Sequence, residues 1–198
     1  MKRVAAASGV REYSRKRAEL RVRGDEPLRI VAVADTHGQP HERAHGLIAA
    51  LAPHAVLHAG DIGDLGVLDG LAGIAPLFVV RGNIDENARD LPDALTLDVV
   101  ADSATRLSLL LVHVGVFGAR IRADAAKLAR EERARLVVCG HSHVPFIGVD
   151  RGLVVFNPGS IGPRRFPLPI VFGVIEVPVS GSVRMHHVSC ETGARWSP

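Results

Sequence analysis

Short apolar runs recur along the chain, and each ends in a polar or glycine-containing turn. In the first half, residues 28–34, 55–58 and 77–80 form such runs, and stretches of helical character near residues 41–51 and 65–73 separate them. Neighbouring parallel strands need a crossover segment of this kind, usually a helix. The first half is therefore predicted to form parallel strands joined by helices.

The second half of the chain has a different pattern. A buried strand is predicted at residues 107–112, a polar helix at 124–133 and another strand at 136–140. Later strand signals are separated by glycine and proline turns and fall at residues 144–149, 153–157, 170–177 and 183–188. Because few helices cover this half, antiparallel pairing is expected there. The fold class predicted is α/β, a four-layer α-β-β-α sandwich of two mixed sheets flanked by helices.

Length and composition fit one domain with an aliphatic core. The 198 residues are 47% hydrophobic but only 4% aromatic, so Val, Leu, Ile and Ala must provide most of the packing. No segment approaches the roughly 18 uninterrupted apolar residues of a membrane helix, so no membrane association is expected. The two cysteines, Cys139 and Cys190, are too few for a disulfide framework. A reducing cytoplasm is the expected compartment.

The charge is distributed unevenly along the chain. The net charge is +3, and much of the basic excess lies before residue 30. We therefore expect a basic N-terminal extension at residues 1–27, a domain at 28–190 and a C-terminal tail at 191–198. A solvated extension is the first interpretation. A nucleic-acid-binding arm is the alternative, but it would need aromatic residues or a folded basic face, and Tyr13 is the only aromatic residue there.

Groups of polar residues stand at the ends of successive apolar runs, where α/β folds bind their ligands. They are Asp35-Thr36-His37, Gly60-Asp61, Arg81-Gly82-Asn83-Ile84-Asp85, His113 and Gly140-His141-Ser142-His143. Each group alone is explained by a turn, a helix cap or a core histidine. Side chains two apart in a strand point the same way, so the Asp-x-His and His-x-His pairs can each face one ion. Together the groups indicate a metal cluster.

This ordered set resembles the calcineurin-like metallophosphoesterase superfamily. The short chain and the segment Asn157-Pro158-Gly159-Ser160 resemble its small bacterial and archaeal phosphodiesterase branch. The resemblance covers about residues 28–177. It implies one metal ion held by Asp35, His37 and His143, and a second held by Asn83, His113 and His141. It also implies that Asp61 bridges the two ions.

The function implied is that of a dinuclear-metal phosphoesterase, with diesters preferred to monoesters. A hydroxide bridging the two divalent ions would attack phosphorus in line with the leaving group. Mixed oxygen and nitrogen ligands suit manganese first, and also iron, zinc, cobalt or nickel. The substrate expected is a small phosphate ester or a nucleotide-like molecule.

The resemblance also suggests residues that contact the substrate. Asn83 could ligate a metal through its oxygen and donate to phosphate through its nitrogen. Asn157, Gly159 and Ser160 would line the pocket, although a simple Pro-Gly turn explains that segment equally well. Candidate phosphate clamps are Arg81, Arg164 and Arg165. For at least two of these arginines, a solvated surface position is the alternative.

Two positions depart from the family pattern. Ile84 stands where many relatives carry a proton-donating His, and Gly115 replaces the second His of a His-Gly-His motif. Loss of general-acid catalysis typically costs roughly 10²–10⁴-fold in rate. These losses keep a scaffold function open, because the retromer subunit with this fold works chiefly by binding partners. A homo-oligomer is compatible with the small relatives, and nucleic acid is not expected as a partner.

Overall fold

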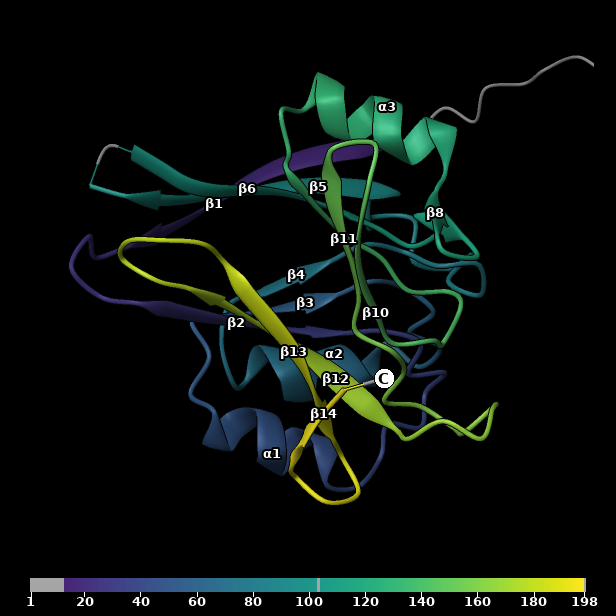
Figure 1. The fold of residues 1–198 in the computed structure, drawn as a ribbon. Coiled ribbons are helices and arrows are strands. Elements are labelled where there is room, and N and C mark those ends of the chain that lie inside the picture. The colour runs from purple at the N-terminus through teal and green to yellow at the C-terminus, as the bar shows by residue number, and fades with distance from the viewer. Residues whose placement is uncertain (1–12, 103, 198) are drawn as a thin grey trace, which may run out of the picture.

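Two six-stranded sheets pack face to face in the computed structural model, which describes residues 13–102 and 104–197 (Figure 1). Sheet A contains, in pairing order, β1 (Arg15–Val22), β5 (Ala94–Ala101), β6 (Ala104–Val112), β9 (Leu136–Val138), β11 (Leu153–Asn157) and β10 (Phe146–Asp150). Sheet B contains β14 (Arg195–Trp196), β13 (Arg184–Ser189), β12 (Val171–Val177), β2 (Leu28–Val33), β3 (Ala55–His58) and β4 (Leu77–Val79). A two-stranded ribbon is formed by β7 (Val116–Phe117) and β8 (Arg120–Ile121).

Strand directions agree with most of the predicted pattern. β2, β3 and β4 are mutually parallel, with crossovers through α1 (Ala44–Ala50) and α2 (Gly66–Ala72). In the second half, β10–β11 and β12–β13 are antiparallel, as expected. β11, however, pairs with β9 in parallel, and β12 joins β2 of the first half in an antiparallel pair. Both sheets are therefore mixed.

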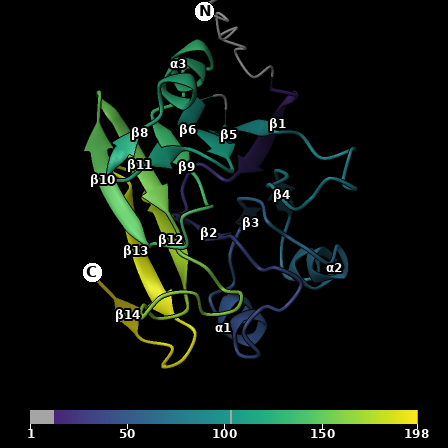
Figure 2. The ribbon, with the colours of Figure 1, turned by 90° about the vertical axis from the view of Figure 1, so that its right-hand side faces the viewer.

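Three apolar layers hold the sandwich together. The central layer fills the space between the sheets and includes Leu57, Leu97, Leu109 and Phe156. A second lies under α3 (Ala123–Glu131), and a third lies under α1 and α2. Figures 1 and 2 show α3 on one outer side and the other two helices on the opposite side. The predicted α-β-β-α order is confirmed.

The basic start of the domain is not a solvated extension over residues 15–22. This segment is β1, an edge strand that pairs in parallel with β5. Leu20 is buried, and Ala18 and Val22 pack against the central layer, whereas the charged residues between them face outward. That alternation is the period-two signal of a half-buried strand, and the density of arginines obscured it. The more N-terminal basic residues Lys2, Arg3 and Arg11 lie outside the described residues.

Elsewhere the structure differs from the predicted elements at β5 and adds details in the C-terminal tail. β5 is a long buried strand for which no element was predicted, although Leu95, Leu97 and Val99 alternate in it. In the C-terminal tail, Trp196 of β14 lies edge-on to the ring of His187. Cys139 and Cys190 are both buried free thiols. In the described part of the chain, every helix falls short of the length and apolar character needed to cross a bilayer.

Candidate metal centre

The predicted metal ligands lie in the loops that follow five strands. Asp35 and His37 follow β2, Asp61 follows β3 and Asn83 follows β4, so these residues extend from sheet B. His113 directly follows β6, and His141 and His143 follow β9, so these extend from sheet A. The ends of the two sheets thus bring together side chains from both layers of the sandwich.

Six of these side chains form two compact groups. Asp35, His37 and His143 form one group, and Asp61, His113 and His141 form the other, with one potential ligand atom of each residue within 4.8 Å of the others in its group. The structure therefore brings together the carboxylates and imidazoles that the sequence placed far apart. Each group also combines residues from both sheets.

Asp61 belongs to the second group but also faces the first. Its Oδ1 is 3.2 Å from Nε2 of His113, and its Oδ2 is 3.8 Å from Nε2 of His37. Each oxygen of one carboxylate therefore faces a different group, which is the geometry a bridging ligand requires. The backbone N–H of Asn83 donates to Asp61 Oδ1 at 2.5 Å. The exposed Asn83 residue lines a small cavity together with His113.

Several buried atoms of the site have no hydrogen-bond partner among the described residues. They are Oδ2 of Asp35, Nε2 of His113 and Nδ1 of His143. An unsatisfied buried polar atom costs roughly 1–3 kcal/mol, so a native structure normally provides a partner. Nδ1 of His113 lies 2.8 Å from the carbonyl of Ala59, and donation there leaves the Nε2 lone pair free for a cation. The donor set therefore fits divalent metal ions.

The backbone at the ligands is unusual. Asp35, His37, Asp61, His141 and His143 have φ values of 53°, 48°, 54°, 69° and 57°. L-residues rarely adopt this left-handed conformation, and it persists where surrounding structure enforces it, often at functional sites. Asp35 and His37, like the histidine pair, lie beyond the ends of their strands. Alternation along a strand therefore does not explain why Asp35 and His37 share a group. His141 and His143 fall in different groups, so the expectation that this pair faces one ion is wrong.

Burial and neighbouring charges shift the acid–base behaviour of the site. Burial raises the pKa of Asp35 to about 7. Burial and the nearby Arg165 guanidinium lower the pKa of His143 to about 4, and they lower the pKa of His37 as well. Burial opposes protonation of His113, but the adjacent Asp61 carboxylate outweighs it and raises that pKa. Neutral His37 and His143 have the lone pairs that metal binding requires.

Asp85 positions two of the ligand-bearing turns, a role that the sequence did not reveal. Its buried carboxylate accepts hydrogen bonds from the backbone N–H groups of Ile62, Gly63 and Gly82. These contacts tie the turn after Asp61 to the turn before Asn83. The spacing Gly82-Asn83-x-Asp85 marks Asp85 as part of the motif. Spacing alone does not show which backbone N–H groups donate to its carboxylate.

His58 and Thr36 join the turns that follow β2 and β3. The fully buried His58 accepts from the N–H of Gly60 through Nδ1, so its Nε2 carries the proton and donates to Oγ1 of Thr36 at 3.0 Å. Thr36 Oγ1 in turn donates to the carbonyl of Ile62. Burial lowers the pKa of His58 to about 4, which keeps this chain in its neutral form.

Two glycines allow the motifs to approach one another closely. A Cβ on Gly82 would lie 2.1 Å from the backbone nitrogen of Asp61. Gly60, at φ 87°, would place a Cβ 2.8 Å from Nδ1 of His113. Side chains at these positions would displace the bridging carboxylate or a ligand. The glycine at position 115 also has a steric explanation, because a Cβ there would lie 2.7 Å from Cβ of Cys139.

The predicted substrate-binding segment mainly supports the ligand loops. Asn157 is fully buried; its Nδ2 donates to the carbonyl of Gly140 and to Ser142 Oγ, and its Oδ1 accepts from the N–H of Gly159. A direct substrate contact does not fit these bonds. Ser160 Oγ donates to the carbonyl of Asp35 and also lines a pocket beside His143. Gly159 supplies a left-handed turn at φ 80°.

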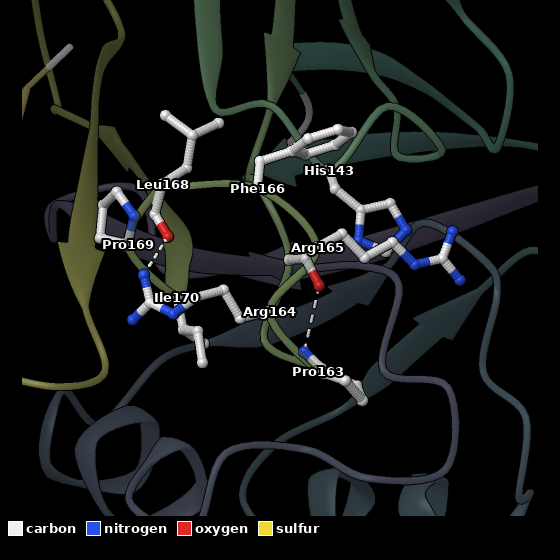
Figure 3. A pocket seen from close by; sticks show the side chains of 10 residues that line it. His143, Pro163, Arg164, Arg165, Phe166, Leu168, Pro169 and Ile170 are labelled. Carbon is white, nitrogen blue, oxygen red and sulfur yellow. Dashed lines mark hydrogen bonds between the residues drawn. The ribbon is translucent and has the colours of Figure 1, made fainter.

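Among the three candidate clamps, the structure places Arg165 at the ligands (Figure 3). Its guanidinium nitrogen lies 3.1 Å from Nε2 of His37, and the exposed side chain runs beside the ring of His143. Arg164 instead contacts Glu191 and the carbonyl of Leu168. Arg81 is held by Asp93, at 2.8 Å and 3.1 Å to its two oxygens. Arg165 is thus the arginine best placed for an anion at the metal groups.

Comparison with known proteins identifies a family of metal-dependent enzymes. Residues 28–179 match the calcineurin-like phosphoesterase superfamily domain. A protein of Methanocaldococcus jannaschii named probable metallophosphoesterase is 30% identical over 145 residues, which cover 70% of this chain and 71% of that protein. The chain belongs to the calcineurin-like phosphoesterase superfamily.

Solved structures share the fold at lower sequence identity. Vacuolar protein sorting 29 of Cryptosporidium parvum has a TM-score of 0.68 at 16% identity, over 86% of this chain and 95% of that one. Yfce, a phosphoesterase from E. coli, has a TM-score of 0.56 at 18% identity, over 86% and 97%. Both an enzyme and a sorting protein are thus built on this fold. The family and the two residue groups support a phosphoesterase that uses divalent metal ions.

Proposed function

We propose that the protein is a dinuclear-metal phosphodiesterase. The observation that carries this proposal is the pair of residue groups joined by Asp61, in which Asp35, His113 and His143 each have a buried polar atom with no hydrogen-bond partner among the described residues. Divalent ions at these groups, manganese first, would activate water and polarise the phosphate for in-line attack. Asp35, His37 and His143 would hold one ion, and Asn83, His113 and His141 the other.

The chain's own residues would orient the phosphate. Arg165 stands next to His37, where a metal ion and a guanidinium would repel one another. When an ion is bound, we expect Arg165 to turn toward the anionic substrate instead, where a guanidinium can donate two parallel hydrogen bonds to phosphate. The Asn83 side chain would assist through its amide nitrogen.

Ile84 restricts the choice of substrate. It is 47% exposed and adjacent to Asn83, and its side chain has no proton to give a leaving group. We therefore expect esters with good leaving groups to react fastest. The Mn²⁺-loaded protein should hydrolyse bis-p-nitrophenyl phosphate and act much more weakly on p-nitrophenyl phosphate, as followed by release of p-nitrophenol. A metal-replete sample that is inert toward diesters, monoesters and nucleotides alike would exclude this function.

The bridging carboxylate gives the sharpest test of the site. Asp61→Asn should lose bound metal and at least about 100-fold in kcat/KM, because even outer-shell changes at metal sites cost 10–100-fold. Elemental analysis and the diester assay would measure both quantities. The matched control is Asp69→Asn, which changes an exposed acid on α2 and should leave both unchanged. Full metal content in Asp61→Asn would refute the ligand assignment.

A scaffold function is the second candidate. It is favoured by the fold shared with vacuolar protein sorting 29 and by the absence of a proton donor at Ile84. A scaffold would keep a rigid surface without needing bound metal for turnover. Stable metal binding without hydrolysis of any phosphate ester in the panel would support this candidate.

A further inference from the structure

A cavity of about 490 Å³ lies at the opposite end of the sandwich from the metal centre. It is lined by the first residues of β6, β9, β11 and β13, whereas the metal ligands follow the last residues of β6 and β9. Ser108 in the cavity and His113 at the metal centre are five residues apart on β6, which is roughly 16 Å at about 3.3 Å per residue. The cavity is therefore separate from the candidate active site.

The inner wall of the cavity is apolar. Leu107 and Leu136 are buried members of the central layer, and Val154, Val183 and Met185 are partly buried and pack against it. The cavity thus opens directly onto the core between the two sheets. Small-molecule sites typically occupy about 300–1,000 Å³ and have mainly apolar walls, and this cavity falls within that range.

Among the described residues, the remaining lining is basic or carries hydroxyl groups and includes no acidic residue. Arg106 is fixed by the carbonyls of Glu26 and Val177. Arg133 and Arg135 are exposed and form no ion pair within residues 13–102 and 104–197. Oγ of Ser108 is buried and has no hydrogen-bond partner in the same part of the chain. The cavity therefore has an uncompensated positive mouth and an available hydroxyl.

The backbone at Arg133 adds a separate observation. Arg133 has a φ of 57° just after α3, in the left-handed conformation that usually ends a helix with glycine. A long cationic side chain therefore occupies a position where glycine would be favoured for local structure. Arg151, which has a φ of 52° and lies outside the cavity lining, provides a natural comparison.

We propose that this cavity binds a small amphipathic anion. An alkyl chain or a flat apolar group would enter between the sheets against Leu107, Leu136 and Met185. Its carboxylate, sulfonate or phosphate head would lie at the mouth and bind Arg133 and Arg135. Apolar burial would supply affinity, and the two guanidinium groups would select for negative charge.

Calorimetric titration of the metal-loaded protein with decanesulfonate, which has no ester bond to hydrolyse, tests this proposal. We expect saturable one-to-one binding, with ethanesulfonate and decanol each at least about 10-fold weaker. The double variant Arg133→Gln/Arg135→Gln should bind decanesulfonate at least about 10-fold more weakly. The variant Arg133→Lys/Arg135→Lys should bind decanesulfonate with a Kd within about 3-fold of the parent's, which separates loss of charge from loss of fold.

Two controls make the outcome decisive. Arg151→Gln should bind like the parent chain, and Asp61→Asn should retain decanesulfonate binding even though it loses metal. The second control separates this site from the proposed phosphodiesterase centre. Equal binding of decanol, or unchanged binding by the Gln/Gln variant with its unfolding midpoint intact, would overturn the proposal.

Discussion

At the scale of single residues, the candidate centre is defined by side chains whose bonding is incomplete without a cation. Asp35, His113 and His143 each leave a buried atom without a hydrogen-bond partner in the described chain. Meanwhile Asn157 is hydrogen-bonded to Gly140, Ser142 and Gly159, and Asp85 accepts from backbone N–H groups. The contrast divides the polar residues of the site into those that face a ligand and those that hold the loops.

Arg165 is the residue whose replacement should separate substrate binding from metal binding. Arg165→Gln removes the guanidinium nearest His37, so we expect KM for the diester to rise about 10-fold while bound Mn²⁺ is retained. Arg164→Gln is the matched control because its neighbouring guanidinium contacts Glu191 instead. Steady-state kinetics with elemental analysis measures both effects, and an unchanged KM in Arg165→Gln would remove this arginine from the substrate site.

Asp85 should act through the turns that it joins. Asp85→Asn replaces an acceptor-only group by one that presents an N–H to donors, so we expect about 1–3 kcal/mol of lost unfolding free energy. Misplaced turns should also weaken Mn²⁺ affinity by about 10–100-fold. Urea denaturation and metal titration test this, with the exposed neighbour Glu86→Gln as control. Normal metal affinity in a destabilised Asp85→Asn would restrict Asp85 to a structural role.

At the scale of elements, periodicity predicted the runs that are apolar throughout and missed β1 and β5, in which polar or charged residues interrupt the apolar ones. The runs at residues 55–58 and 153–157 coincide with β3 and β11 because nearly every side chain in them is apolar. β1 was hidden because five of its eight residues are charged. The types of residue at the strand ends predicted the metal-binding chemistry of the site. The left-handed turns and the hydrogen-bond partners of Asn157 could not be predicted, because they depend on contacts between segments that are distant in sequence.

The edge strand β1 gives a direct test at this scale. Leu20 is 8% exposed and packs against the central layer. Leu20→Ala should therefore cost about 2 kcal/mol or more of unfolding free energy, as for other large-to-small core changes. The control Glu19→Ala removes only a surface ion pair with Arg21 and should cost under about 1 kcal/mol. Equal urea midpoints for the two variants would show that β1 does not contribute to the folded core.

At the scale of the whole molecule, each metal group combines both sheets. Asp35 and His37 extend from sheet B and His143 from sheet A, while Asp61 from sheet B meets His113 and His141 from sheet A. An ion that binds both layers stabilises the folded state by mass action, by about 2.7 kcal/mol at 100 times its Kd. Only the docked arrangement of the sheets presents either complete group.

Metal should therefore raise the thermal midpoint of unfolding, and a chelator should reverse the rise. Mn²⁺ at saturating concentration should shift the midpoint of the parent chain upward by several degrees. Asp61→Asn should show little of this shift, and Asp69→Asn should show all of it. Calorimetry with and without EDTA measures the effect. An equal shift in Asp61→Asn would place the stabilising ion elsewhere on the molecule.

The pairing of β2 with β12 has a consequence for biosynthesis. β2 leads into Asp35 and His37, yet one of its neighbours in sheet B is β12, at Val171–Val177. A ribosome-bound chain that has released only its first half therefore lacks the strand that completes the sheet around these residues. Ion capture should follow translation of nearly the entire polypeptide, and bound metal should retard unfolding more than it accelerates folding.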